Sequence, residues 1–250
     1  MRSKNKKFWS FKASSAGRAE LFLYGIIESQ SWWGDEITPK TFKAELDALG
    51  DIADLDVYIN SDGGDVFAGQ AIHSMLKRHK AKVTVHIDGL AASIASVIAM
   101  AGDTVLMPRN AMLMVHKPWT YAYGNSDDFR KKADDLDQIQ ESLVAAYQDK
   151  TGMDRDKLIA LLEAETWLTA EEALNYGFAD AIEAEKSVAA ALDGGVLTLN
   201  GQEMDLKKFK NAPIIMVPEA ENQPKNEAPR PKRSLAFYER VAQNNRHRRV

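Results

Sequence analysis

The sequence predicts an α/β fold in which helices cover a largely parallel sheet. Short apolar runs rich in β-forming residues alternate along the chain with longer segments of helical periodicity, a pattern typical of βαβ units. Of the 250 residues, 45% are hydrophobic and 27% are charged, which is the composition of a globular protein with one sizeable domain. Because no internal repeat is visible, we expect one such domain with appended segments.

The first half of the chain supplies three predicted strands and the helices between them. The strands lie at 19–27, 55–60 and 82–87. Thr38 is a typical helix N-cap and Pro39 a typical first helical residue, so a helix is expected to begin here. The apolar face of this helix is formed by Phe42, Leu46 and Leu49.

Two further helices are expected before the middle of the chain. The first spans about 67–79, and its apolar positions are Phe67, Ile72, Met75 and Leu76. The second begins at about residue 92, within a run of small and aliphatic residues. Each helix comes after a predicted strand and before the next one, which is the order of a βαβ unit.

The second half of the chain continues this alternation. Two short strands are expected at 103–108 and 111–116, and the segment 179–184 closes the core. A long helix is predicted to begin at Ser126 as its cap, with an apolar stripe made of Phe129, Ala133, Leu136, Leu143 and Tyr147. Two shorter helices follow at 154–165 and 169–177, the second ended by Gly177.

The remaining segments are expected to lie outside this core. Two β-like runs flank Asn200-Gly201, a strong hairpin signal. Five of the eight prolines fall at 213–231, which excludes a helix or a central strand there. We therefore divide the chain into a basic, flexible N-terminus at 1–18, a core domain at 19–186, a β-hairpin extension at 187–210, and a Pro-rich linker with a basic tail at 211–250.

Composition excludes several classes of protein. The absence of cysteine excludes disulfides, thiolate nucleophiles and thiolate metal sites, and the five histidines lack HxH or HExxH spacing, so no metal site is expected. No apolar run reaches the length of about 18 residues that a membrane span needs. The basic start is not followed by the apolar region of a signal peptide, so we expect a soluble intracellular protein.

Charge separates the tail from the rest of the chain. From residue 222 to the end there are eight Lys or Arg and two Asp or Glu, a balance of +6. Because the whole chain has a formal charge of −4, the remaining residues carry −10. An acidic body with a basic tail leaves several roles open for the tail: docking to another protein, contact with nucleic acid, removal by self-cleavage, or simple solubilisation.

Three segments have residues suited to chemistry. In NSDGG (60–64), a strand end meets two glycines, so backbone N–H groups can face a ligand, although a plain turn explains the segment as well. Ser93 falls where a strand ends and a helix begins, whereas Ser96 lies one turn deeper, where a hydroxyl usually bonds to its own helix. Taken alone, Ser93 also fits a small packing residue.

His116 ends an apolar strand, which is a position from which a histidine can reach into a cleft. His86 lies within a predicted strand, and His73 and His79 lie on a helix. By default, the acidic side chains of Glu163, Glu165, Glu171 and Glu172 form a solvated helical face. One of these carboxylates turned inward could orient a histidine.

The order of these features resembles the ClpP family of serine peptidases. The resemblance is greatest to its phage- and prophage-encoded branch, the ClpP-like head maturation (prohead) proteases. It is carried by YINSDGGDVFAGQAI, GLAASIASVIAMAGD, MPRNAMLMVHKP and ETWLTAEEALNYGFAD, which follow the family order. The resemblance as a whole covers roughly residues 19–184. The resemblance implies the ClpP/crotonase-like fold, with repeated β-β-α units and a protruding helical handle.

The resemblance also implies roles for five residues. Ser93 matches the family's nucleophile and His116 its general base. Glu165 aligns with the third triad member, which is aspartate in housekeeping ClpP, whereas the phage-like branch has the same ETW segment. Gly64 and Ile94 match the backbone donors of the oxyanion hole. No metal and no organic cofactor is needed for this chemistry.

Two positions receive no role from the family. Asp62 stands where the family usually has a proline, and nothing transfers to Ser96. The function implied for the remaining residues is a serine endopeptidase that acts through a Ser93 acyl-enzyme. Its implied substrates are capsid or scaffold proteins processed during phage head assembly, in the cytoplasm of the bacterial host cell or in the prohead.

The resemblance further implies a homo-oligomer, since the family forms stacked rings in which the handle helix, here about 126–150, makes ring-to-ring contacts. The chain has no ATPase motif, so an unfoldase, if one is required, is a separate protein. Two alternatives remain open. A crotonase-type acyl-CoA enzyme would share the fold but would not need the Ser/His pair, and a catalytically silent homologue would serve as a structural protein in a phage head.

Overall fold

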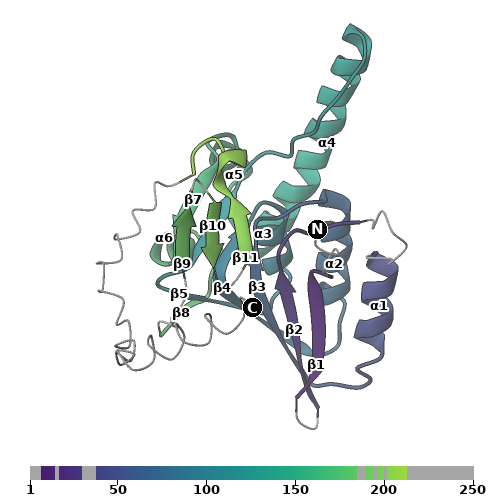
Figure 1. Ribbon diagram of the computed structural model, residues 1–250, viewed down its shortest axis with the longest axis vertical. Helices are drawn as coiled ribbons and strands as arrows, with labels where there is room; N and C mark the ends of the chain where they lie inside the picture. Colours follow the sequence, from purple (N-terminus) through teal and green to yellow (C-terminus); the bar gives the residue numbers. More distant parts are fainter. Residues whose placement is uncertain are drawn as a thin grey trace, which may run out of the picture. The chain divides into compact units, whose positions relative to one another are not determined.

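The protein is built around one mixed sheet with helices packed on it (Figure 1). The computed structural model describes residues 7–14, 17–29, 38–184, 190–193, 196–199 and 202–212. The chain divides into two units, Met1–Ile215 and Met216–Val250, and all described residues belong to the first. Expectations for the Pro-rich linker and basic tail from 213 onward therefore fall outside the described residues.

The main sheet has eight strands in the order β1-β2-β3-β4-β5-β8, with β6 paired to β4 and to β7. The strands are β1 Trp9–Ala13, β2 Arg18–Tyr24, β3 Asp54–Ser61, β4 Lys82–Ala92, β5 Thr104–Pro108, β6 Met112–Val115, β7 Thr166–Thr169 and β8 Ala181–Glu183. The neighbours from β2 to β8 are parallel, as is the β4–β6 pair, whereas β1–β2 and β6–β7 are antiparallel. The predicted α/β class with a largely parallel sheet is confirmed.

Strand β4 is the branch point of this sheet. Its first part, Thr84–His86, pairs with β5, and its last part, Leu90–Ala92, pairs with β6. Every residue from Leu90 to Ala92 is buried. The strand therefore extends five residues beyond the predicted end at 87 and brings the chain to Ser93 inside the protein.

The helices are α1 Pro39–Asp47, α2 Val66–Lys77, α3 Ile94–Ala99, α4 Ser126–Thr151, α5 Arg155–Glu163 and α6 Ala170–Asn175, with a 3-10 turn η1 at Leu206–Lys208. Thr38 caps α1 and Pro39 is its first residue, as predicted. For α4, however, Asn125 rather than Ser126 is the N-cap, because its side chain accepts from the N–H groups of Asp127 and Asp128. Both residue types form caps, so composition alone could not separate them.

The long helix α4 projects from the sheet as the expected handle (Figure 1). Only the second half of its predicted stripe is buried: Leu143 and Tyr147 lie in the core, whereas Ala133 is exposed and Phe129 is 52% exposed. A second apolar position also differs, since Phe67 at the start of α2 is 66% exposed rather than part of the core. Helical periodicity cannot show where a helix leaves its packing partner.

The N-terminal segment departs from the expected flexible start. Strand β1 pairs with β2 along its whole length, and the side chains of Phe8 and Trp9 are buried. Trp9 packs edge-on against Phe42 of α1, with ring centroids 5.6 Å apart. This strand was not predicted, because only Trp9 and Phe11 stand out from its polar and small neighbours.

The extension after the core forms a second, three-stranded sheet in the order β11-β10-β9, with β9 Ala190–Asp193, β10 Val196–Leu199 and β11 Gln202–Asp205. The expected hairpin is present as the antiparallel β10–β11 pair, and β9 adds a strand that the sequence did not suggest. Leu197 and Leu206 pack in one apolar cluster with Leu90, Ala92 and Met114 of the main sheet. The extension thus lies over the end of β4 that leads to Ser93.

Candidate active site

The turn between β4 and α3 holds Ser93 in an unusual backbone conformation. Its φ of 54° and ψ of −129° lie in a region that residues with a side chain rarely adopt. Such a conformation costs about 1–3 kcal/mol and persists only where surrounding contacts impose it. Here the Ser93 N–H donates to the Met114 carbonyl at 3.0 Å, and the buried helix α3 begins at the next residue. The hydroxyl is therefore presented by a rigid, strained turn.

A second turn brings two glycines against this serine. Gly63 has a φ of 93°, and a Cβ built on it would lie 2.6 Å from the Ser93 Cβ. Gly64 has a φ of 145°, and a Cβ there would lie 2.0 Å from the Ile27 carbonyl oxygen. Larger residues do not fit at either place. The NSDGG segment is thus more than a plain turn, since its backbone contacts Ser93 directly.

Two backbone N–H groups near Ser93 are candidates for binding an oxyanion. The segment around Gly64 bonds to Ile27 through the Gly63 carbonyl (2.8 Å) and the Asp65 N–H (2.7 Å), and neither bond uses the Gly64 N–H. Ile94 is the first residue of α3, where N–H groups have no acceptor within the helix. Gly64 lines the pocket at Ser93, whereas the Ile94 side chain is only 2% exposed and faces the core.

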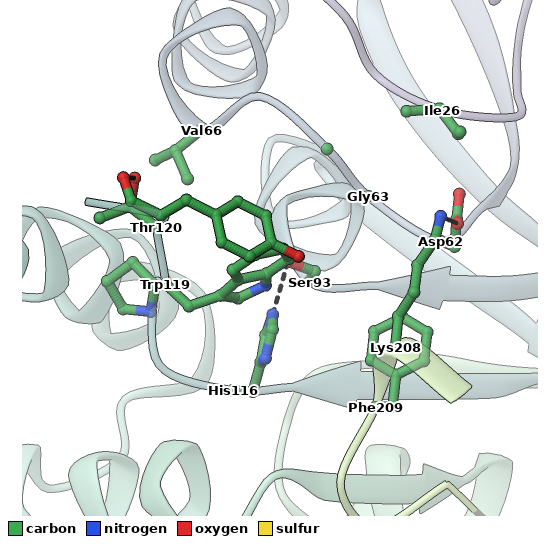
Figure 2. A pocket seen from close by; sticks show the side chains of 13 residues that line it. Ile26, Asp62, Gly63, Val66, Ser93, His116, Trp119, Thr120, Lys208 and Phe209 are labelled. Carbon is green, nitrogen blue, oxygen red and sulfur yellow. Dashed lines mark hydrogen bonds and ion pairs between the residues drawn. The ribbon is translucent and has the colours of Figure 1, made fainter. Parts of the chain in front are cut away.

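Ser93 and His116 form a direct contact. His116 follows β6, which runs parallel to the end of β4, so the two strand ends lie side by side. The Ser93 Oγ is 2.7 Å from His116 Nε2, the contact drawn as a dashed line in Figure 2. With the imidazole proton on Nδ1, the serine hydroxyl donates to Nε2. This is the arrangement in which a histidine can act as general base.

Burial lowers the pKa of His116 below its ordinary value, and the negative charge of Glu165 opposes this shift. Since the lowered pKa favours the neutral imidazole, His116 is held in the form that accepts a proton. Its ring also lies edge-on to Phe209 of the extension, with centroids 6.2 Å apart. The histidine is therefore enclosed by the core on one side and by the extension on the other.

Glu165 lies close enough for its charge to act on His116, but its carboxylate is engaged elsewhere. It accepts the backbone N–H groups of Lys210 (3.0 Å) and Asn211 (2.6 Å). In the part of the chain that the structure describes, no hydrogen bond joins Glu165 to His116. Like Ser93, Glu165 has a positive φ, here 46°. Of the three residues expected to form a triad, two are in contact and the third is nearby.

The other acidic candidates have structural partners. Glu163 pairs with Lys117 at 3.0 Å and Glu171 with Arg109 at 2.9 Å. Glu172 accepts from the Thr169 N–H and hydroxyl as part of the cap of α6. These three carboxylates therefore have the surface roles that the sequence suggested by default.

The other histidines in the described ranges do not line the pocket at Ser93. His86 lies within β4 and contacts Glu183 (3.1 Å) and Asp56 (3.4 Å). His73 belongs to α2, and His79 follows that helix. Among the described residues, no group of three or more His, Cys, Asp or Glu side chains is placed to hold a metal ion.

Ser93 and His116 open onto a pocket of about 340 Å³. It is lined by Ile26, Asp62, Gly63, Gly64, Val66, Ser93, His116, Pro118, Trp119, Thr120, Tyr121, Lys208 and Phe209. Three groups meet here: the glycine turn, the segment after His116, and the end of the extension (Figure 2). The last of these was missed from the sequence, because no local signal in the residues after 205 indicates which part of the core they contact.

A family comparison gives this geometry its context. The Clp protease family model matches residues 24–186, which include both turns, His116 and Glu165. This chain belongs to the Clp protease family. The segment that follows residue 186, including Lys208 and Phe209, lies beyond the matched region.

Curated relatives agree with this assignment. The chain is 32% identical over 154 residues to an ATP-dependent Clp protease proteolytic subunit of Bacteroides fragilis, covering 59% of this chain and 74% of the relative. It is 33% identical over 140 residues to the subunit of that name from Deinococcus radiodurans, covering 55% and 68%. It is 31% identical over 154 residues to the subunit of that name from Bacteroides thetaiotaomicron, which covers 59% of this chain and 70% of the relative.

Membership in the Clp protease family makes this chain a serine-type peptidase with the ClpP fold. Members of the family form ring-shaped homo-oligomers and act on peptides. The family thus answers the choice left open between a peptidase and an acyl-CoA enzyme of similar fold. None of the helices in the described ranges combines the length and the apolar content that crossing a membrane requires.

The second serine of the Clp protease core is fully buried behind the first. Ser96 Oγ donates to the Ser93 carbonyl at 2.6 Å and contacts the Tyr147 hydroxyl at 2.8 Å. It does not line the pocket. Ser96 therefore links α3 to α4 and supports the strained turn from inside, which agrees with the expectation that its hydroxyl bonds within its own helix.

Proposed function

We propose that this chain hydrolyses peptide bonds with Ser93 as nucleophile and His116 as general base. The observation that carries the proposal is the 2.7 Å contact between Ser93 Oγ and His116 Nε2 at a strained strand-to-helix turn. A serine hydroxyl is a weak nucleophile until a neighbouring base takes its proton. The pocket beside this pair leaves space for a substrate carbonyl.

The steps follow from these positions. His116 Nε2 takes the Ser93 hydroxyl proton while Oγ bonds to the substrate carbonyl carbon. The resulting imidazolium gives that proton to the leaving amine as the C–N bond breaks, which leaves an acyl-enzyme. A water molecule then attacks the ester with His116 again as base. The proton returns to Ser93 Oγ as the acid product is released.

The backbone N–H groups of Gly64 and Ile94 stabilise the tetrahedral oxyanion in this proposal. It is supported by the Gly64 conformation, which places that backbone in the pocket, and by the position of Ile94 at the start of α3. Donors of this kind are worth about 3 kcal/mol each in serine peptidases. Glu165 is the proposed third triad member, because its charge raises the pKa of His116 and so stabilises the imidazolium.

The first prediction separates the two serines. Ser93→Ala is expected to abolish cleavage of an unfolded protein substrate, because it removes the nucleophile. Ser96→Ala is expected to retain at least a substantial fraction of the activity, because Ser96 lies behind the turn and does not line the pocket. The measurement is the rate of peptide release at equal folded concentration. If Ser93→Ala cleaves as fast as the unsubstituted chain, the proposed role of Ser93 is wrong.

For the biological substrate we propose capsid or scaffold proteins of a phage head. The support is the resemblance of four linked segments to the ClpP-like head maturation proteases, together with a segment after residue 186 that the family model does not match. The test is incubation with purified phage capsid and scaffold proteins. Cleavage at defined sites by the unsubstituted chain, and not by Ser93→Ala, is expected. If these proteins stay intact while unfolded proteins are degraded, the chain has a general proteolytic role instead.

A further inference from the structure

A buried carboxylate in the pocket is paired with a lysine of the extension. The Asp62 side chain is only 5% exposed, and the Lys208 ammonium lies 3.4 Å from its Oδ2. The other oxygen, Oδ1, is buried and has no hydrogen-bond partner among the described residues. Figure 2 shows Lys208 reaching toward Asp62 beside Gly63.

An acid at this place is unfavourable unless a cation accompanies it. Burial raises the pKa of Asp62, the Lys208 ammonium acts in the opposite direction, and the nearby Asp205 adds to the rise. A buried carboxylate that loses its partner is strongly destabilised. Asp62 directly precedes Gly63, whose Cα lies against Ser93. A peptide held at Ser93 therefore passes close to this carboxylate.

We propose that Asp62 forms an acidic subsite of the peptidase pocket that binds a lysine or arginine side chain of the substrate, and that Lys208 fills this subsite within the chain. The inference deepens the proposed function and rests on it. Lys208 and the adjacent Phe209 both line the pocket, and the Phe209 ring lies beside His116. Two consecutive residues of the extension thus occupy the space that substrate side chains need.

The test compares binding of peptides that differ at one side chain. The protein is the full chain with Ser93→Ala, so that no peptide is cleaved. Fluorescent alanine peptides carry one lysine, arginine, norleucine or glutamate, moved one position at a time. Lys208→Met removes the ammonium that pairs with Asp62 and keeps an apolar side chain of similar length. Lys207→Met is the matched control, since Lys207 is exposed and it is Lys208 that pairs with Asp62.

With Lys208→Met, the lysine peptide is expected to bind about tenfold tighter than the norleucine peptide at one or more of the tested positions, as a charge-assisted hydrogen bond would produce. Adding Asp62→Asn is expected to remove this preference, and Lys207→Met is expected to bind the peptides like the chain that carries Ser93→Ala alone. The subsite is refuted if no position favours lysine or arginine over norleucine, or if the preference survives Asp62→Asn. Peptide binding does not need the Ser93 hydroxyl. If the unsubstituted chain cleaves no peptide, the proposed function is wrong, but the binding preference at Asp62 is still measured.

A separate observation concerns the acid of the triad. The two oxygens of Glu165 accept from the N–H groups of consecutive residues, Lys210 and Asn211. The Asn211 side chain also donates to the Ala164 carbonyl at 2.7 Å, so the extension holds Glu165 and the residue before it. Two lysines near the pocket pair with other carboxylates and not with Glu165: Lys117 pairs with Glu163, and Lys208 pairs with Asp62.

We infer that Lys210 and Asn211 withhold Glu165 from His116, and that displacement of this segment frees the carboxylate to accept the Nδ1–H of the histidine. This inference also rests on the proposed triad. A freed Glu165 stabilises the imidazolium more strongly than it does at present, so Ser93 should react faster and the acidic limb of its pH profile should move to higher pH.

The test uses Asn211→Asp, which replaces the donor to Ala164 by a carboxylate beside Glu165, and the milder Asn211→Ala. The rate of Ser93 labelling by a fluorophosphonate is measured against pH. Both variants are expected to react faster, by about tenfold for Asn211→Asp, with the acidic limb at higher pH. In a Glu165→Gln background both changes should vanish. If folded Asn211→Ala has an unchanged labelling rate and an unchanged acidic limb of the pH profile, this inference is wrong. If Ser93 never reacts in any variant, the proposed peptidase function is wrong instead.

Discussion

At the scale of single residues, the protein combines a serine in a strained backbone conformation with an unusually close glycine. Ser93 keeps its positive φ because β4, α3 and the Met114 carbonyl fix the chain on both sides of it. Gly63 lets the opposite turn approach to a distance that any Cβ would prevent. The hydroxyl is thereby aimed at His116 before a substrate arrives, which lowers the entropy lost when the reacting groups are brought together.

The protonation of His116 should set the acidic limb of activity. An ordinary imidazole has a pKa of about 6.5, and burial lowers the pKa of His116 below that value. His116 should therefore be mostly neutral at pH 6.5, and activity should fall only at lower pH. Glu165→Gln removes the charge that opposes this shift, so the limb should move to still lower pH and the rate should decrease. The measurement is kcat/KM against pH for both proteins. An acidic limb above pH 6.5 in the unsubstituted chain would contradict this reading of His116.

A stability prediction follows from the partner of Ser96. Removing the Ser96 hydroxyl leaves the buried hydroxyl of Tyr147 without this partner, which should lower the free energy of unfolding by about 1–3 kcal/mol. The double variant Ser96→Ala/Tyr147→Phe removes both hydroxyls and should recover part of the loss. Urea unfolding of the two single variants and the double variant measures the coupling. Strict additivity of the two single losses would show that this hydrogen bond does not stabilise the fold.

At the scale of elements, strand β4 and the extension position the site together. The branching of β4 between β5 and β6 brings the strand ends at Ser93 and His116 side by side. The extension covers the same region through Leu197 and Leu206. Parallel sheets commonly place binding sites at the carboxyl ends of their strands, and in this chain the extension packs against that end of β4.

Strand β1 should contribute substantially to stability, although it lies at the edge of the sheet. Trp9 is 3% exposed, and its indole N–H donates to Glu45 at 3.1 Å. Trp9→Ala is therefore expected to lower the free energy of unfolding by about 3–5 kcal/mol. Ser10→Ala, an exposed change on the same strand, is the control and should have little effect. Equal midpoints of denaturant unfolding for the two variants would mean that β1 does not pack as described.

At the scale of the whole molecule, features encoded in short segments of sequence were predictable, whereas contacts between segments far apart in the sequence were not. The alternation of strands and helices, the cap at Thr38 and the positions of Ser93 and His116 all depend on short segments of sequence. By contrast, the resemblance of a short segment singled out Glu165, but the hydrogen bonds that Glu165 accepts from Lys210 and Asn211 involve residues 45 and 46 positions away in the sequence. The exposure of Phe67 likewise depends on whether another element packs against the start of α2, and helical periodicity does not show this.

The most direct test of the account is the site at which a fluorophosphonate modifies the protein. The labelled residue is mapped by mass spectrometry in the unsubstituted chain, Ser93→Ala, His116→Ala and Ser96→Ala, together with the native mass of each. The account predicts modification at Ser93, complete loss in Ser93→Ala, a large decrease in His116→Ala, and retention in Ser96→Ala. Modification at another serine, or none at Ser93 in any oligomeric state, would contradict it.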